Sequence, residues 1–232
     1  MSFARGFWPT FVVQFSGALN DNLFKNVVVL TIAFDPSMSE VLANQFVIAA
    51  GALFILPFAL FSLPGGVLAD RVDKARLIRT LKALEVVLMA GGALALEAAN
   101  VPGMLVVTFA MGVQSAFFGP TKYAILPQHL RAGVLPRVNG FFQLSTFAAI
   151  LIGTLVAGLV SSLESMRETL AGALVISVAV LGLIAALLVP SAPPAQELED
   201  KRAEVKATLR RGRLLPVEIG RASCRERVYT KV

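Results

Sequence analysis

The chain has 232 residues, of which 56% are hydrophobic and only 16% are charged, and its mean hydropathy is +0.73. Soluble domains are about half apolar and a quarter charged, and here the apolar residues form long blocks, so the composition indicates several membrane-spanning helices. The net charge of +6 does not indicate a nucleic-acid-binding protein, because the basic residues lie in short segments between those blocks. With one cysteine, Cys224, a disulfide framework and a cysteine metal site are excluded, and we expect no metal or cofactor.

Six apolar blocks predict an all-α membrane protein with six transmembrane helices in residues 1–190. A helix of about 20 residues crosses a hydrocarbon core, so every block is long enough. The blocks cover residues 7–33, 42–65, 77–97, 101–126, 137–161 and 169–190.

The first block contains a polar stretch, "GALNDNLFKN", at residues 17–26. Asp21 and Lys25 are four residues apart, so they share a helix face and could pair. A charge at mid-membrane costs at least about 2.5–3.5 kcal/mol, so this face must meet protein or water. We expect Gln14, Asp21, Asn22 and Lys25 to line a substrate path. The alternative is a structural seam of polar side chains that holds helices together.

The segment "GGVLADRVDKARLIR", residues 65–79, joins the second and third blocks. Gly65 and Gly66 would let helices approach closely. Asp70, at a helix end, can pair with nearby basic groups in one conformation and release them in another, which predicts a conformational gate. The alternative is a plain basic loop. The expected gate residues are Gly66, Asp70, Arg71, Lys74 and Arg76.

The fourth block contains "QSAFFGPTKYAILP", residues 114–127. Lys122 lies in an apolar run directly after Gly119 and Pro120, and proline is expected to break the helix there. Broken helices at membrane depth commonly line substrate sites, so Lys122 and Tyr123 join the predicted substrate path. The alternative is that Lys122 extends to the lipid headgroups.

Asn139 and Gln143 lie near the start of the fifth block. They either line the same path or make contacts between helices, and the sequence does not separate the two. His129, the only histidine, is expected in a solvated loop. We find no set of residues suited to catalysis, so we expect a protein that is not an enzyme.

Basic residues cluster before the first block, between the second and third, between the fourth and fifth, and after the sixth. This bias predicts a cytoplasmic N-terminus. Residues 191–216 are expected to be a cytoplasmic linker toward a seventh, missing helix. The final residues 217–232 contain "EIGRASCRERV", which resembles a translated sequencing adapter, and we expect them to be non-native.

Residues 65–79 resemble the G-x-L-A-D-R-x-G-R-K/R signature of the major facilitator superfamily, with Asp73 in place of the second glycine. The stretches "QFSGALNDNLFKN", "FFGPTKYAILPQHL" and "NGFFQLSTFAAILIG" resemble a narrower family, the bacterial lysophospholipid transporters of the LplT type and the transporter domains of their acyltransferase fusions. The resemblance implies the N-terminal half of a twelve-helix fold, built from two inverted three-helix repeats, in the bacterial inner membrane. It implies transport of lysophospholipids for re-acylation, with Asp21 and Lys122 as charged groups of the path.

Two other functions remain open at this point. The chain could belong to a proton-coupled exporter of drugs or small solutes, or it could be the membrane domain of a fused phospholipid acyltransferase. The expected partners are the lipid bilayer, a lysophospholipid or other amphiphilic substrate, the missing C-terminal half and, in a fusion, an acyltransferase domain.

Overall fold

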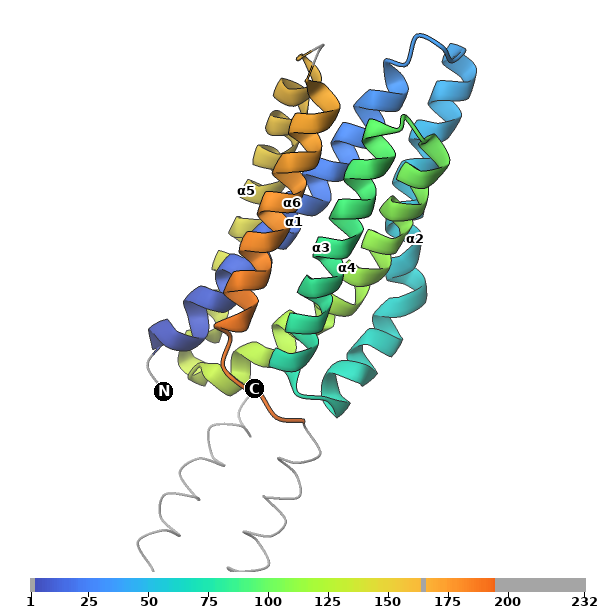
Figure 1. Ribbon diagram of the computed structural model, residues 1–232. Helices are drawn as coiled ribbons and strands as arrows, with labels where there is room; N and C mark the ends of the chain where they lie inside the picture. The colour runs from blue at the N-terminus through green and yellow to red at the C-terminus, as the bar shows by residue number, and fades with distance from the viewer. Residues whose placement is uncertain (1–2, 164–165, 195–232) are drawn as a thin grey trace, which may run out of the picture. The chain divides into compact units, whose positions relative to one another are not determined.

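The computed structural model describes residues 3–163 and 166–194, which form six α-helices and one short 3₁₀ turn, with no strand in that part of the chain (Figure 1). This confirms the all-α fold. Most of the predicted linker 191–216 and all of the tail 217–232 lie outside the described residues. The elements are α1 Phe3–Ala33, α2 Glu40–Arg71, α3 Lys74–Glu97, α4 Val101–His129, η1 Ala132–Val134, α5 Leu135–Ser161 and α6 Arg167–Leu187.

Short polar side chains begin three of the helices. Ser39, Asp73 and Asn100 are the N-caps of α2, α3 and α4, and each accepts a hydrogen bond from a backbone N–H in the first turn. These residues stand where one apolar block ends and the next begins, so the loops on both sides of α3 are only a few residues long.

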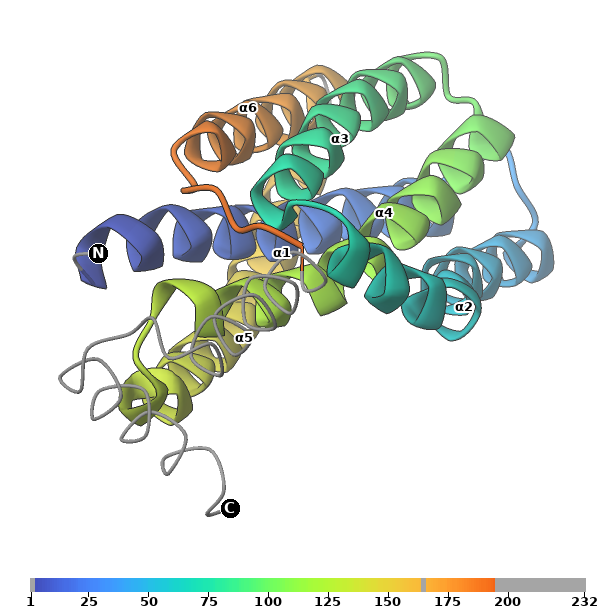
Figure 2. The same ribbon diagram turned by 90° about the horizontal axis from the view of Figure 1, so that it is seen from below.

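The helices pack as two related sets of three. The largest contacts join α2 with α4, α1 with α5 and α3 with α6, followed by α3 with α4 and α1 with α6. Exchanging α1 with α4, α2 with α5 and α3 with α6 converts this set of contacts into itself. Because α1 and α4 run in opposite directions (Figure 1), the two sets are inverted repeats. Seen from below, α1 runs between α5 on one side and α3 and α6 on the other (Figure 2).

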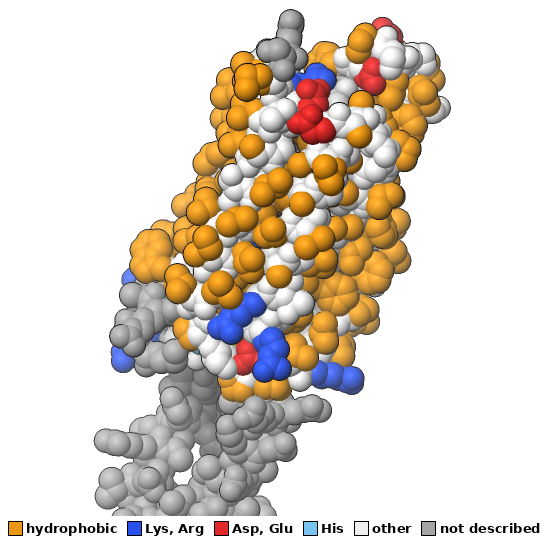
Figure 3. Space-filling view, in the orientation of Figure 1, with side chains coloured by type: hydrophobic (Ala, Val, Ile, Leu, Met, Phe, Trp, Pro, Cys, Tyr) orange, Lys and Arg blue, Asp and Glu red, His pale blue; other side chains and the backbone are white. Residues whose placement is uncertain are grey.

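Four helical segments in the described residues are long and apolar enough to cross a membrane: α2, α4, Ala132–Ser161 and α6. The other two, α1 and α3, have 31 and 24 residues, and they carry the charged and amide side chains described below. A helix of 24 residues rises about 36 Å, which is sufficient to span. Hydrophobic side chains cover the middle of the face in Figure 3, and Lys and Arg gather mainly at the end that carries the N-terminus.

Helices α2 and α4 are held together by close contact between their backbones and not by hydrogen bonds. A Cβ atom at Gly112 would lie 2.5 Å from the carbonyl oxygen of Phe54, and one at Gly65 would lie 3.1 Å from that of Ala116. A Cβ at Gly66 would meet nothing within 4 Å, so the expected close approach holds for Gly65 and is wrong for Gly66. Within the described residues, no side chain of α2 forms a hydrogen bond with another helix.

The expectation that Pro120 breaks the fourth helix is wrong. Helix α4 continues from Val101 to His129 with Pro120 inside it. Pro120 removes the N–H that would bond to the carbonyl of Ala116, and within the same turn the hydroxyl of Thr121 donates to the carbonyl of Phe117 at 2.8 Å. In an apolar environment, neighbouring helices and Ser or Thr side chains satisfy the backbone groups that proline frees, so the helix does not have to end there.

Candidate functional site

The predicted substrate-path residues gather on the face of α1 and α4 that α2 and α5 flank. The four residues Asp21, Asn22, Lys25 and Lys122 are half-buried. Tyr123 is 40% exposed, Asn139 and Gln143 are exposed, and Gln14 is buried. The structure therefore brings most of these residues to one side of the bundle.

Asp21 and Lys25 have separate partners, so the predicted pair between them is wrong. The hydroxyl of Ser115, on α4, donates to Asp21 Oδ2 at 2.6 Å. Lys25 Nζ donates to Asn22 Oδ1 at 3.3 Å and lies 5.3 Å from the centre of the Phe54 ring on α2. The physical reason is that α4 supplies a short hydrogen bond to the carboxylate, while the amide and the aromatic face solvate the ammonium.

Lys122 also lacks an ion pair with Asp21. Its Nζ lies 5.1 Å from the centre of the Tyr123 ring, and the Tyr123 hydroxyl donates to Gln143 Oε1 at 3.3 Å, which links α4 to α5. Gln14 Nε2 donates to Thr146 Oγ1 at 2.7 Å and links α1 to α5. Gln14 and Gln143 therefore make contacts between helices, one of the two roles left open for Gln143.

A buried polar cluster, which was not predicted from the sequence, lies behind this face. Lys82 and Glu85, three residues apart on α3, form an ion pair at 2.7 Å with side chains 0% and 2% exposed. The amide of Asn20 donates to Glu85 Oε1 at 3.1 Å, and that of Gln114 donates to Oε2 at 3.3 Å. From the sequence, Lys82 was counted only among the basic residues between the second and third apolar blocks, and no function was predicted for it. Its spacing from Glu85 inside an apolar run was the available signal, the same signal that singled out Asp21.

Two glycines make room for the buried ammonium group. A Cβ atom at Gly17 on α1 would lie 2.8 Å from Lys82 Nζ, and one at Gly182 on α6 would lie 3.2 Å from it. Lys82 Nζ also lies 5.7 Å from the centre of the Phe118 ring. The cluster therefore sits where α1, α3, α4 and α6 meet.

The predicted gate residues fall at the junction of α2 and α3. Gly66, Asp70 and Arg71 lie in the last turns of α2, and Lys74 and Arg76 in the first turn of α3. Asp70, Arg71 and Arg76 are exposed, and Lys74 is buried. The two ion pairs of the described residues are Lys82–Glu85 and Arg167–Glu168, so Asp70 is not paired with an arginine in this structure.

Asp73, which replaces a glycine of the signature, holds the chain that follows α6. Its carboxylate accepts from the backbone N–H of Arg76 at 2.8 Å, from the Ser191 hydroxyl at 2.6 Å and from the Ala192 N–H at 3.0 Å. Partial burial acts to raise the pKa of Asp73, but these hydrogen bonds outweigh it and hold the pKa below its ordinary value. Arg79 Nη2 donates to the carbonyl of Val189 at 2.8 Å. We call Asp73, Arg79 and residues 189–192 the α6 clasp.

His129 belongs beside this clasp, so its predicted place in a solvated loop is wrong. It is the last residue of α4, it is 9% exposed, and its Nε2 lies 3.3 Å from the carbonyl oxygen of Ser191. A Cβ atom at Gly6 would lie 2.7 Å from the His129 Cβ, which shows how closely α1 covers it.

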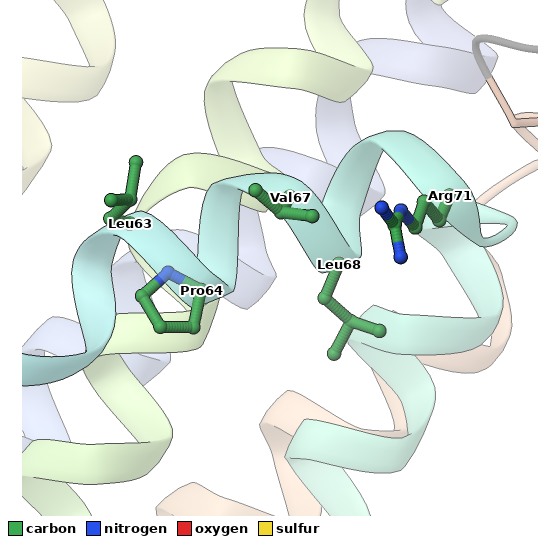
Figure 4. Close-up of a pocket in the computed structure, with 5 residues that line it drawn as sticks. All are labelled: Leu63, Pro64, Val67, Leu68 and Arg71. Atoms are coloured by element: carbon green, nitrogen blue, oxygen red, sulfur yellow. The ribbon is translucent and has the colours of Figure 1, made fainter.

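An apolar groove lies elsewhere, on the surface of α2. Its lining residues all come from that helix (Figure 4): Leu63, Pro64, Val67, Leu68 and Arg71. Of these, only Arg71 belongs to a predicted functional set. The groove does not contain the charged residues of the predicted path, and its apolar character is typical of a lipid-facing surface.

Comparison with known proteins identifies the fold family. The Major Facilitator Superfamily matches residues 10–226. The lysophospholipid transporter LplT of Cronobacter sakazakii is 30% identical over 68% of this chain and 37% of its own length. The LplT of Salmonella schwarzengrund is 28% identical, over 74% of this chain and 40% of its length, and that of Klebsiella pneumoniae 26%, over 86% and 47%.

The chain spans less than half the length of each of these relatives. No solved structure matches it significantly. The superfamily match covers nearly all of the six helices, and their arrangement as two inverted repeats agrees with it. This chain belongs to the Major Facilitator Superfamily.

Proposed function

We propose that the chain is the N-terminal half of a secondary transporter that moves lysophospholipids across the bacterial inner membrane for re-acylation. The observation that carries the proposal is the half-buried set of Asp21, Lys25 and Lys122 on one face of otherwise apolar helices. A zwitterionic or anionic headgroup needs cations and hydrogen-bonding groups, and a single acyl chain needs an apolar flank. The relatives named as lysophospholipid transporters support this substrate class.

The second half of the transporter is part of the proposal. The polar face of α1 and α4 is open in this chain, with Tyr123 40% exposed. A C-terminal six-helix half would cover it and complete a path through the bilayer. In a fused protein, an acyltransferase domain would follow and consume the transported lysophospholipid.

The proposed orientation has the N-terminus in the cytoplasm. The junctions between α2 and α3 and between α4 and α5 lie at the same end as the N-terminus, and they carry Arg71, Arg76, Arg131 and Arg137. Retention of basic residues on the cytoplasmic side supports this choice. At that end, Gly66, Asp70, Arg71, Lys74 and Arg76 would form the gate, with Asp70 exposed and able to pair with a group of the second half.

Uptake of labelled lysophosphatidylethanolamine tests the function. Spheroplasts that express the full-length gene product should take it up, and Asp21→Ala should abolish uptake. Asp35→Ala is the matched control, because Asp35 lies in the turn after α1 and bonds only locally, to Ser37. Normal uptake by Asp21→Ala would contradict the site. Drug or solute export that depends on the proton gradient, without lysolipid uptake, would indicate the exporter instead.

A further inference from the structure

We propose that Ser115, whose chain neighbour Gln114 is anchored to Glu85 of the buried Lys82–Glu85 pair, is a positioning residue that fixes the carboxylate of Asp21 for the cationic group of the substrate. The inference rests on the proposed function, because it assigns Asp21 to the substrate path. It adds a set of residues from α3 and α4 that act through Asp21 without touching the substrate.

The Ser115 hydroxyl has one proton and two neighbouring acceptors. Its Oγ lies 2.6 Å from Asp21 Oδ2 and 3.2 Å from Gln114 Oε1. A hydrogen bond to a charged carboxylate is shorter and stronger than one to a neutral amide, so the proton goes to Asp21. This bond holds one carboxylate oxygen. No hydrogen bond to Oδ1 is seen among the described residues, so the second oxygen remains for a substrate cation.

Gln114 cannot move freely beside Ser115, because the other end of its amide is anchored. Its Nε2 lies 3.3 Å from the carbonyl oxygen of Leu81 and 3.3 Å from Glu85 Oε2. Both acceptors belong to α3, and the side chain of Gln114 is 3% exposed. Gln114, the residue directly before Ser115, is therefore fixed against α3.

Glu85 closes the chain of contacts back to α1. It accepts from Lys82 Nζ at 2.7 Å and from Asn20 Nδ2 at 3.1 Å. Asn20 directly precedes Asp21 and Gln114 directly precedes Ser115, so these hydrogen bonds and the backbone between the adjacent residues form one closed ring that joins α1, α3 and α4. Such a ring fixes the register of α1 against α4 at the substrate path, which a single contact would not do.

Transport kinetics of the full-length protein test the role of Ser115. We expect Ser115→Ala to raise the half-saturation concentration for lysophosphatidylethanolamine about 10-fold, with the maximal rate within about 2-fold of the original. Ser115→Thr keeps the hydroxyl and should restore the original value. Ser145→Ala is the control, because that buried hydroxyl bonds only to the carbonyl of Phe142 on its own helix and should leave both parameters unchanged.

A second readout does not depend on transport. In the same protein, the rate at which a carbodiimide modifies Asp21, located by mass spectrometry, should rise several-fold in Ser115→Ala and return in Ser115→Thr. If Asp21→Ala abolishes uptake and Ser115→Ala matches the original protein in both measurements, the positioning role is wrong and the proposed function stands. If Asp21→Ala transports normally, Asp21 is not part of the substrate path, and the positioning role is wrong even where modification is faster. A full-length protein that takes up no lysophosphatidylethanolamine would instead contradict the proposed function.

Discussion

At the scale of single residues, the burial of Lys82 and Glu85 is tolerated because nearly every polar atom of the pair has a partner. Glu85 accepts hydrogen bonds from Lys82, Asn20 and Gln114, which lie on three different helices. A buried ion pair gains little over an apolar pair of similar volume, but one buried charge without its partner is costly. The pair is therefore stable as a unit and vulnerable at either member.

Glu85→Ala alone should lower the free energy of unfolding by about 3–5 kcal/mol, because it leaves the Lys82 ammonium buried without its carboxylate. The double variant Lys82→Met with Glu85→Leu should recover most of that loss. Denaturation of the purified protein in mixed detergent micelles measures both. If the double variant lost as much stability as the Lys82→Met and Glu85→Leu single variants together, the two residues would not act as a coupled pair.

At the scale of helices, the contact between α2 and α4 depends on a glycine that has no space for a side chain. Gly112→Ala places a methyl group 2.5 Å from the backbone oxygen of Phe54, so the two helices must separate. We expect a loss of about 1–3 kcal/mol in unfolding free energy. Gly119→Ala, on the same helix, meets nothing within 4 Å and should be neutral or slightly stabilising. Equal effects in the two variants would contradict this account.

The α6 clasp should respond to pH through Asp73. Because its pKa in the folded protein is below the ordinary value of 3.8, the charged carboxylate stabilises the fold above that value. The contribution is lost as the pH falls through the lower, folded pKa. Asp73→Asn keeps a capping oxygen without the charge, so it should be less stable than the original at pH 6. The two stabilities should converge as the pH falls through the folded pKa of Asp73, and a constant difference in denaturation experiments would contradict the role of the charge.

The positions of the helices could be predicted from the sequence, but the hydrogen-bond partners of their side chains could not. Apolar blocks and short polar caps determine where helices run, so five of the predicted spans lie within helices. The sixth, 169–190, runs three residues past the end of α6 at Leu187. The end of the second span was placed at residue 65, although α2 continues to Arg71, because the charged gate segment was placed outside the apolar block. Pro120 was wrongly expected to end the helix. In an apolar environment water is not available to bond the freed backbone groups, so the helical conformation is retained.

At the scale of the whole molecule, the inverted-repeat architecture came from the resemblance, and the contact pattern confirms it. The sequence also predicted that Asp21 and Lys122 avoid a lipid-facing surface, because the cost of burying charge applies to any apolar helix. The pairing of Asp21 with Ser115 could not be predicted, since it depends on how α1 and α4 cross. Similarly, no count of basic residues separates Lys82, which is buried, from Arg76, which is exposed on the same helix.

The proposed orientation predicts that the two ends of the bundle lie on opposite sides of the membrane. Ala98 follows α3 and Gly133 precedes α5, and both are exposed. With Cys224 replaced by serine, Ala98→Cys should react with an impermeant maleimide added outside intact cells. Gly133→Cys should react only after the membrane is opened. The reverse pattern would place the N-terminus outside.

Among the described helices, α2 differs from its neighbours because it forms no hydrogen bond or ion pair with them, and its one polar contact is the Phe54 ring beside Lys25 Nζ. Helices α1, α3 and α4 are joined by the polar ring, and α6 is held by its clasp, whereas α2 meets α4 through glycines and apolar side chains. A displacement of α2 along its own axis would exchange one set of van der Waals neighbours for another and would break no hydrogen bond. Helix α2 is thus the element of the bundle that can shift along its axis at the lowest cost. The exposed charges of Asp70 and Arg71 lie at its C-terminal end.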